Sequence, residues 1–247
     1  VAESVRDPYA YYDNNVSGTL CLLGAMRRAD VDRLLFSSTA AVFGLPQQAL
    51  IDEDHPTTPI NPYGASKLMV ERVLADAASA YGLRSVALRY FNAAGASQSA
   101  EIGESHTPET HLIPNVLRAA AGEGPPLRLF GNDYATADGT CVRDYVHVDD
   151  LASAHLAALD YMHAHGGAAR FNLGNGAGFS VLQVVDAAAA VCGRELPREW
   201  APRRAGDPPK LVASSVRAQR ELGWTPSCTD IGAIIESAWR WHQAPRY

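Results

Sequence analysis

Residues 62–89, PYGASKLMVERVLADAASAYGLRSVALR, decide the fold class because they join a long helical pattern to a short apolar strand. Residues 62–80 have helical spacing, and Pro62 suits the first turn, where its missing N–H would have no helical partner. Residues 84–89 predict the strand, and RLLFSS at 33–38 predicts an earlier strand that is buried on both faces. Strand, helix and strand in this order are typical of a parallel α/β unit.

The chain extends this unit in both directions. Residues 9–28 show helical spacing, whereas the stretch after residue 92 turns into a loop rich in Ala, Ser and Gly up to residue 108. Further predicted elements are helices at 111–121, 149–163, 180–191, 216–222 and 230–241, and strands at 127–130, 142–148 and 170–173. We therefore expect an α/β fold in which residues 1–92 form part of a Rossmann-type, doubly wound parallel sheet. Residues 93–247 are expected to form mainly a smaller C-terminal α/β substrate lobe, with segments that return to the first part.

Composition excludes several classes of function. The 247 residues include 21 Lys and Arg and 27 Asp and Glu, so the net charge of −6 argues against a nucleic-acid groove. No apolar run approaches the roughly 18 residues of a membrane span, and no secretory signal is visible. The cysteines form no CxxC pair, which indicates reduced thiols in a cytoplasmic protein. The histidines have no HExxH-like spacing; even His163 and His165 are typical of a solvated helix end, so we expect no metal site.

The motif Tyr63-Gly-Ala-Ser-Lys67 carries the strongest chemical signal. Residues four apart on a helix share a face, so the phenol and the ammonium are expected to lie close together. The positive charge and the helix N-terminus would lower the Tyr63 pKa and make the phenolate a general base. Such pairs are also common on surface helices. Thr39 adds a hydroxyl after the strand at 33–38, where ligands bind in parallel sheets, although these hydroxyls could also serve only the turn.

Six segments resemble, in order along the chain, the UDP-glucose 4-epimerase family of extended short-chain dehydrogenase/reductases. They are YYDNNVSGT (11–19), FSSTAAVFG (36–44), NPYGASKLMVE (61–71), LRYFNAAGA (88–96), FGNDYATADGTCVRDYVHVDDLA (130–152) and APRRAGD (201–207). The resemblance implies NAD-dependent interconversion of UDP-glucose and UDP-galactose in galactose metabolism. The sugar C4 would be oxidised, the 4-keto sugar would turn over, and the hydride would return to its opposite face. A homodimer is also implied, with Val70, Val73 and Leu74 as contacts unless they are buried within the monomer.

The resemblance further implies a role for each residue at a matching position. The catalytic group would be Thr39, Tyr63 and Lys67, which would also bind NAD together with Asn14 and Phe91. The UDP-sugar would be bound by Asn92, His111, Leu112, Phe130, Arg143, Arg204 and Asp207. Arginines suit diphosphate oxygens, and an aromatic ring suits uracil. Taken without the resemblance, the two arginines would be interpreted as a salt bridge to a carboxylate such as Asp144 and as a solvated surface charge.

Alternatives within the family are separated by single residues. Ala40 and Ala41, which follow Thr39, cannot transfer protons, so a 4,6-dehydratase is disfavoured. Another NAD-dependent nucleotide-sugar epimerase or a decarboxylase stays open. His111 stands where the family often has Asn, and its ring can still donate to a sugar or phosphate. Leu211 aligns with a position that some members fill with a bulky aromatic, so we hypothesise that UDP-GlcNAc and UDP-GalNAc also fit.

The glycine turn that binds phosphate near the N-terminus of this family is not found. The candidate GNGAG at 174–178 follows a strand, but the third glycine of GxGxxG would fall on Phe179, so we interpret the stretch as an ordinary turn. We therefore expect that roughly 80 residues, nearly three βα units, precede Val1. The alternative is a chain that binds UDP-sugars without catalysis.

Overall fold

The computed structural model describes residues 1–123, 126–204 and 207–246, and it divides the chain into two compact units. Unit 1 comprises Val1–Phe91, Ser153–Leu173 and Ala213–Trp224, and unit 2 comprises Asn92–Ala152, Gly174–Val212 and Thr225–Tyr247. The chain therefore enters unit 2 after Phe91 and returns to unit 1 twice. The residues predicted for catalysis and NAD all belong to unit 1, and those predicted for the UDP-sugar all belong to unit 2.

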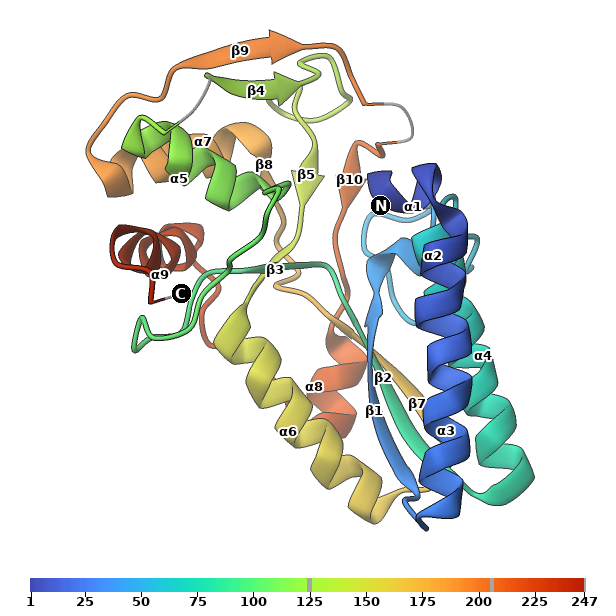
Figure 1. Ribbon diagram of the computed structural model, residues 1–247. Helices are drawn as coiled ribbons and strands as arrows, with labels where there is room; N and C mark the ends of the chain where they lie inside the picture. The colour runs from blue at the N-terminus through green and yellow to red at the C-terminus, as the bar shows by residue number, and fades with distance from the viewer. Residues whose placement is uncertain (124–125, 205–206, 247) are drawn as a thin grey trace. The chain divides into compact units, whose positions relative to one another are not determined.

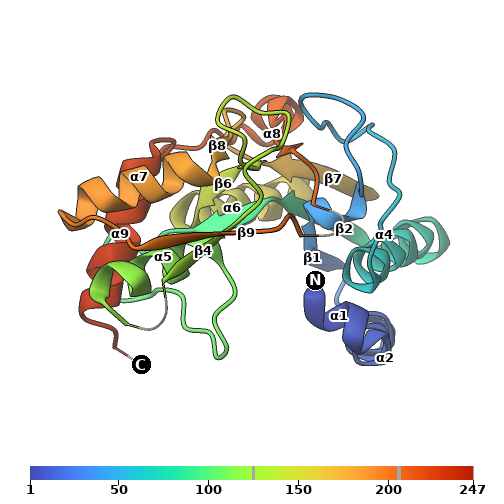
Figure 2. The ribbon, with the colours of Figure 1, turned by 90° about the horizontal axis from the view of Figure 1, so that it is seen from above.

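Unit 1 is built on a parallel sheet. Its described strands are β1 (Arg33–Thr39), β2 (Arg84–Tyr90) and β7 (Ala168–Leu173), in the order β1-β2-β7. Its helical elements are α1 (Ala2–Arg6), α2 (Pro8–Tyr12), the π-helix η1 (Asp13–Ser17), α3 (Gly18–Arg28), the 3-10 turn η2 (Ala40–Val42), α4 (Pro62–Tyr81), most of α6 (Val148–Ala164) and α8 (Val216–Leu222). Helices α3 and α4 lie on one face of the sheet and α6 and α8 on the other (Figures 1 and 2). The predicted parallel α/β unit is confirmed.

Helix α4 has the start and the end that its sequence encodes. The Asn61 side chain accepts a hydrogen bond from the Gly64 backbone N–H at 2.9 Å, and this satisfies one of the free donors of the first turn. Gly82 ends the helix with a φ of 76°, a left-handed conformation that glycine adopts without strain. On its inner face Val70 and Leu74 are buried against α3 and β1. These contacts fix the face of α4 that carries Tyr63 and Lys67.

A buried ion pair joins three elements of unit 1. Glu71 of α4 accepts hydrogen bonds from Nε and Nη2 of Arg89 in β2, at 2.9 and 2.5 Å. The hydroxyl of Ser38 in β1 donates to the same carboxylate at 2.6 Å. The Arg89 guanidinium also lies over the Phe43 ring, with its central carbon 5.0 Å from the ring centroid. Because Arg89 is wholly inaccessible to solvent, this pairing decides how α4 sits on the sheet.

The expectation that the first strand is buried on both faces is only partly right. Residues 33–37 of β1 are half-buried, and only its last two residues are fully buried. The physical reason is its position, since β1 lies at the edge of the described sheet, whereas the central strand β2 is buried over most of its length.

Unit 2 is the predicted α/β lobe, but it is not markedly smaller than unit 1, because units 1 and 2 comprise 124 and 123 residues. Its elements are β3 (Asn92–Ala94), α5 (Leu112–Ala121), β4 (Leu127–Phe130), β5 (Val142–Arg143), β6 (Tyr145–His147), β8 (Phe179–Ser180), α7 (Val181–Cys192), β9 (Arg198–Ala201), β10 (Lys210–Leu211) and α9 (Ile231–Gln243). Strands β3 and β6 pair in parallel, as do β4 and β9; β5 pairs with β10 in parallel and with β8 antiparallel. Helices α5, α7 and α9 share a core that includes Val116, Val184 and Ile234 (Figure 1). Ser180 caps α7, as predicted.

Some elements of unit 2 differ from the prediction. The strand predicted at 142–148 is divided into β5 and β6, because Asp144 between them turns its carboxylate toward the backbone N–H groups of Asn175 and Gly176. The loop predicted from residue 92 begins with β3. Strands β9 and β10 were not predicted, since both are short and lack an apolar alternation.

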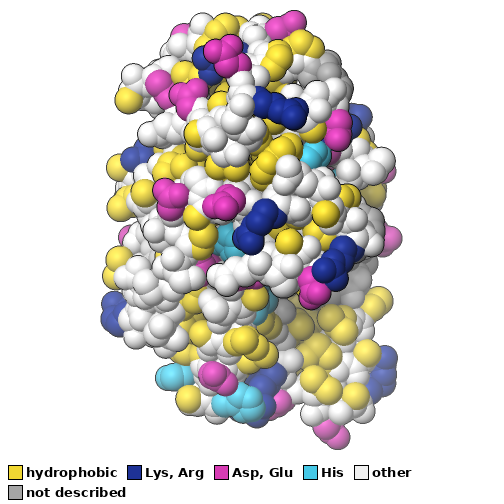
Figure 3. Space-filling view, turned by 90° about the vertical axis from the view of Figure 1, so that its left-hand side faces the viewer, with side chains coloured by type: hydrophobic (Ala, Val, Ile, Leu, Met, Phe, Trp, Pro, Cys, Tyr) yellow, Lys and Arg dark blue, Asp and Glu magenta, His cyan; other side chains and the backbone are white. Residues whose placement is uncertain are grey.

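The surface carries mixed charge. On the face shown in Figure 3, Lys and Arg side chains are interspersed with Asp and Glu side chains and with apolar ones. Among the described residues, no helix combines the length and the apolar character that a membrane crossing requires.

We predict that Glu71→Ala destabilises the protein by about 3–5 kcal/mol, because it leaves the Arg89 guanidinium buried without a counter-charge. The melting temperature should fall by roughly 6 °C or more in differential scanning calorimetry. The matched control is Asp76→Ala on the same helix, which removes an exposed ion pair with Arg72 and should change the melting temperature by less than about 2 °C. Equal shifts for the two variants would contradict the assigned role of the ion pair.

Candidate active site

The catalytic group predicted from the sequence comes together in unit 1. Tyr63 lies in the first turn of α4, and Thr39 ends β1. The Lys67 ammonium nitrogen lies 5.9 Å from the centroid of the Tyr63 ring, so the two side chains share a face of the helix. The Thr39 side chain forms a hydrogen bond with the Tyr63 phenol. Thr39 Oγ1 also accepts the backbone N–H of Ala41 at 3.1 Å, which leaves its own proton to be donated.

The protonation of this group differs from the prediction. Burial raises the pKa of Tyr63 above that of a free phenol, and the hydrogen bond from Thr39 offsets only part of the increase. Burial also lowers the pKa of Lys67. The Lys67 ammonium donates to the Ser37 carbonyl at 3.0 Å and lies 4.9 Å from the centroid of the Phe36 ring. The predicted lowering of the phenol pKa is therefore wrong for the chain by itself, because desolvation of the phenolate raises this pKa and Lys67 is not among the groups that shift it.

The two further residues predicted for NAD lie on separate elements of unit 1. Asn14 is exposed on η1, and its side-chain amide donates to the Asn15 side chain at 3.0 Å. Asn15 in turn donates to the Ser66 hydroxyl of α4 at 2.9 Å, which ties η1 to the helix of the catalytic group. Phe91 follows β2 directly, and its ring centroid lies 6.5 Å from that of Phe43. Asn15 and Ser66 were not identified from the sequence, because nothing in the motifs that contain them indicates that their side chains are hydrogen-bonded to each other.

In unit 2, Arg143 and Asp207 form a pair across 64 positions of sequence. Arg143 Nη2 lies 3.4 Å from the Asp207 carboxylate, and Arg143 Nη1 donates to the carbonyls of Val142 and Pro208, each at 2.9 Å. Leu211 is the register partner of Arg143 in the β10–β5 pair. The guanidinium is thus held by a carboxylate and two carbonyls, and the carboxylate of the salt bridge is Asp207 rather than the adjacent Asp144.

Phe130 and Arg204 form a second pair in unit 2. The guanidinium carbon of Arg204 lies 4.1 Å from the centroid of the Phe130 ring, a short cation–π contact. Arg128 lies 5.4 Å from the same centroid. Arg204 is exposed, as the surface-charge alternative requires, yet it is stacked on an aromatic ring. Residues 205 and 206 of the predicted segment 201–207 lie outside the described residues.

The other three residues predicted for the UDP-sugar are engaged within unit 2. The Asn92 side-chain amide donates to the Asp144 carbonyl at 2.8 Å. The His111 ring, which we expected to be available for donation to a ligand, is hydrogen-bonded to Glu104, and this contact raises the pKa of the imidazole. Leu112 begins α5 and packs against the core of the unit. The structure thus brings Arg143 together with Asp207, and Phe130 with Arg204, while these three serve local structure.

Sequence reasoning missed the residue that organises this region. Asp144 is fully buried, and its carboxylate accepts the backbone N–H groups of Asn175 at 2.6 Å and Gly176 at 3.1 Å. The stretch 174–178 is therefore a turn that holds a carboxylate, in agreement with its interpretation as an ordinary turn. The backbone carbonyl of Asp144 accepts a hydrogen bond from the Asn92 side chain. A charged residue within the apolar run 142–148 was the available signal.

Comparison with known proteins identifies the family. The family model described as GDP-mannose 4,6 dehydratase matches residues 1–236. The UDP-glucose 4-epimerase of Lacticaseibacillus casei is 51% identical over 243 residues, which are 98% of this chain and 73% of that protein.

Solved structures give the same result at the level of the fold. The UDP-glucose 4-epimerase from Brucella ovis in complex with NAD is 48% identical and superposes with a TM-score of 0.94, covering 97% of this chain and 74% of that one. The UDP-Glc/GlcNAc 4-epimerase from the human pathogen Campylobacter jejuni is 44% identical with a TM-score of 0.84, covering 98% of this chain and 74% of that one. The resemblance of the six segments is thereby confirmed, and the chain belongs to the GDP-mannose 4,6 dehydratase family, among its UDP-glucose 4-epimerases.

Proposed function

We propose that the protein interconverts UDP-glucose and UDP-galactose by NAD-dependent oxidation and re-reduction at C4 of the sugar. The observation that carries the proposal is the group of Thr39, Tyr63 and Lys67, in which a half-buried phenol has a hydroxyl partner and an ammonium on its own helix face. A phenol in this setting can exchange a proton with a sugar hydroxyl. The names of relatives that are about half identical over nearly the whole chain support the same activity.

The chain's own residues handle the proton. Tyr63 takes the proton of the sugar 4-hydroxyl when C4 is oxidised and returns it when C4 is reduced. Thr39 donates a hydrogen bond that stabilises the developing phenolate, in the direction in which this bond already shifts the phenol pKa. Burial keeps the pKa of Tyr63 above its ordinary value, and the Lys67 ammonium nitrogen lies 5.9 Å from the centroid of the phenol ring. The lysine is therefore proposed to stabilise the ionised phenol.

The residues around Lys67 fit an NAD molecule. Among the described residues, one of the three ammonium donors is engaged by the Ser37 carbonyl, which leaves donors for a diol such as a ribose. Asn14 offers an exposed amide, and Phe91 offers an aromatic ring at the carboxyl end of β2. When bound, NAD supplies a reversible hydride acceptor for the sugar C4, so the net redox change is zero. The relative from Brucella ovis was solved in complex with NAD.

The residue pairs of unit 2 suit a UDP-sugar. The forked guanidinium of Arg143 matches diphosphate oxygens, and the Asp207 carboxylate keeps it charged and oriented. The Phe130 ring offers a flat apolar surface for uracil, and the stacked Arg204 adds a positive charge beside it. We propose that Asn92 and Leu112 contribute to UDP-sugar binding indirectly, by fixing the loop and the helix in which they lie. His111 is proposed to contribute through the position of its loop.

A dehydratase, which the description of the family model names, is not favoured by the structure of β1 and η2. Ala40 and Ala41 follow Thr39 in η2, and Ala41 uses its backbone N–H to hold the Thr39 hydroxyl. Neither side chain can supply the acid or base that elimination of water needs. Another nucleotide-sugar epimerase, a decarboxylase and a UDP-sugar binder without catalysis are the alternatives. Chromatography of products from UDP-glucose and UDP-glucuronate distinguishes all three from the proposed activity. A cytoplasmic location of the protein remains a prediction.

We predict that Tyr63→Phe lowers kcat by roughly 10²–10⁴-fold in the full-length protein, since it removes the proton acceptor. Binding of UDP-glucose, measured by calorimetry, should change less than about threefold because the ring is retained. The matched control is Tyr81→Phe at the end of the same helix, which should keep the native kcat. Native turnover in Tyr63→Phe would refute the assigned role.

Leu211 bears on the range of substrates. We propose that the native protein also converts UDP-GlcNAc to UDP-GalNAc; the relative from Campylobacter jejuni is a UDP-Glc/GlcNAc 4-epimerase. Leu211→Tyr should reduce kcat/KM for UDP-GlcNAc by roughly 100-fold and that for UDP-glucose by less than about threefold, because a larger side chain occupies the space of the N-acetyl group. Leu211→Met, which conserves volume, should retain both activities. Native protein without UDP-GlcNAc turnover would contradict this proposal.

A homodimer is the third part of the proposal. Of the three predicted contacts, Val70 and Leu74 are buried in the core of unit 1 and cannot supply the contact between subunits, and Val73 is half-buried and packs against the same core. Leu20 of α3 and Met69 of α4, in contrast, are about half exposed on the same pair of helices. Exposed apolar side chains on neighbouring helices are typical of a surface that a second subunit covers.

We predict that the double variant Leu20→Glu, Met69→Glu is monomeric in light scattering coupled to size-exclusion chromatography, whereas the native protein is a dimer. The cost of burying two carboxylates in an apolar interface gives the direction. The control is Leu156→Glu on α6, where the side chain is 65% exposed, and this variant should stay dimeric. A native monomer, or a dimer that survives the double substitution, would exclude these helices as the interface.

A further inference from the structure

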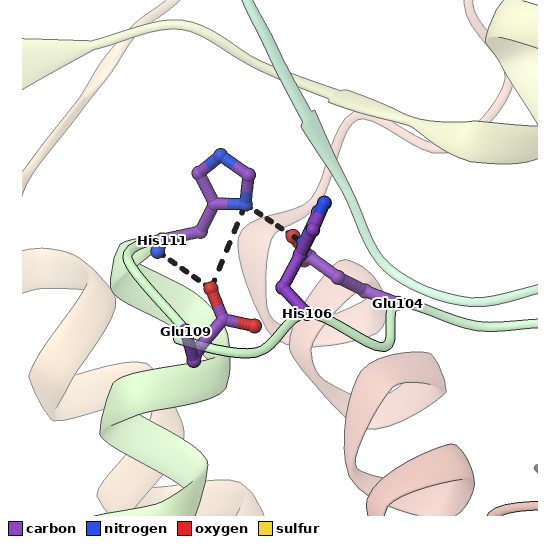
Figure 4. A group of neighbouring side chains, drawn as sticks. All are labelled: Glu104, His106, Glu109 and His111. Atoms are coloured by element: carbon purple, nitrogen blue, oxygen red, sulfur yellow. Dashed lines mark hydrogen bonds and ion pairs between the residues drawn. The ribbon is translucent and has the colours of Figure 1, made fainter. Parts of the chain in front are cut away.

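The loop between β3 and α5 gathers four side chains that can bind a metal ion. They are Glu104, His106, Glu109 and His111, and one ligand atom from each lies within 4.8 Å of the others. Figure 4 shows the His111 ring pointing toward both carboxylates from the start of α5. The four residues occupy only eight positions of the chain. No metal site was predicted here, because the spacing of these four residues matches none of the recurrent ligand motifs.

The donor atoms converge on one point of the loop. His106 Nδ1 lies 2.9 Å from Glu104 Oε1, and His111 Nδ1 is hydrogen-bonded to the same oxygen. Glu109 Oε1 lies 3.7 Å from His111 Nδ1. Two imidazole nitrogens and two carboxylate oxygens are a donor set that Zn²⁺ accepts in tetrahedral geometry. With bonds of about 2.0–2.2 Å, the donors of such a site are roughly 3.4 Å apart. Glu104 Oε1 would therefore move away from the two imidazoles, while the donors that are now up to 4.8 Å apart would move together.

The surrounding backbone holds two of these ligands in place. Glu109 Oε1 accepts the backbone N–H groups of Thr110 at 2.6 Å and His111 at 2.7 Å, and its side chain is only 6% exposed. The Glu104 carbonyl accepts the indole N–H of Trp241 in α9 at 3.0 Å. Gly103 lies against the same indole so closely that a Cβ there would be 2.2 Å from Trp241 Cγ. Secondary contacts of this kind orient metal ligands and raise affinity.

The negative charge of the two carboxylates would be balanced by a bound divalent cation. With both imidazoles neutral, the two carboxylates of the cluster carry a charge of −2, which a divalent ion would neutralise. Hydrogen bonds to the histidines can neutralise it only if protons are taken up. We propose that Glu104, His106, Glu109 and His111 bind one Zn²⁺ ion, which fixes the loop of residues 95–111 ahead of α5.

The ion would have a structural role in unit 2. All four ligands precede Leu112, the first residue of α5, so their joint coordination would set where this helix begins. A site with four protein ligands is closed to substrate, which is typical of structural zinc. The proposal does not depend on the proposed epimerase activity, because zinc binding is measured directly.

The test is zinc binding by full-length protein that carries no affinity tag and has been stripped with a chelator. Calorimetric titration with ZnCl₂ should show one equivalent bound with a Kd of about 1 μM or lower, and Co²⁺ should give the intense visible bands of tetrahedral coordination. Zinc should also raise the melting temperature of the stripped protein. The affinity should fall by roughly 100-fold or more in Glu104→Gln and in His106→Ala.

Both variants keep the test clear of misfolding. His106 is 56% exposed, so its removal leaves the core unchanged, and glutamine at position 104 keeps the size of the native side chain. The matched control is His163→Ala, His165→Ala, which removes the other closely spaced pair of histidines and should bind zinc as the native protein does. The proposal is overturned if the stripped native protein binds no zinc, if His106→Ala binds it with native affinity, or if the control loses it.

Discussion

The arrangement of unit 1 depends on the buried ion pair between Glu71 and Arg89. Removing two charges from water is costly, and the cost is recovered only if each finds its partner in good geometry. The pair therefore allows essentially one placement of α4 on β2, and the Ser38 hydroxyl extends the same constraint to β1. Thr39 follows Ser38 directly, and Tyr63 stands on α4. The contact between threonine and phenol is thus a consequence of charges that take no part in the chemistry.

A buried carboxylate has the same organising role in unit 2. Asp144 is inaccessible to solvent, and its charge is satisfied by backbone N–H groups of the turn at 174–178. This contact interrupts the predicted strand and leaves Arg143 at the end of β5, within reach of Asp207. In both units the residues proposed for function are positioned by neighbours whose polar groups would be costly to leave unpaired. The proposed zinc cluster would be a third case, with a cation as the partner of the carboxylates.

For Tyr63, the spacing of residues predicts which side chain is its neighbour, but the environment sets the pKa of the phenol. Helical spacing correctly predicts that the phenol and the Lys67 ammonium share a face. It does not reveal that the phenol is desolvated by partial burial, which reverses the expected change in the pKa of Tyr63, or that the lysine also donates to the Ser37 carbonyl. A base of this kind is ionised only where positive charge collects around it. The proposed reaction therefore makes ionisation of the phenol depend on bound ligands as well as on the chain.

The parallel α/β unit, the limits of its long helix and the family follow from the sequence alone, because period, caps and motifs are local properties. The sequence also predicted which side chains would form the catalytic group, since four positions on a helix define a distance. Folding in three dimensions, in contrast, makes Asp207 the partner of Arg143, stacks Arg204 on Phe130, and places the His111 ring in a cluster of histidines and glutamates. These pairings depend on how the backbone folds back on itself, and burial then sets the energy of each charge. Neither the pairings nor the burial of the charges can be predicted from the spacing of residues along the chain.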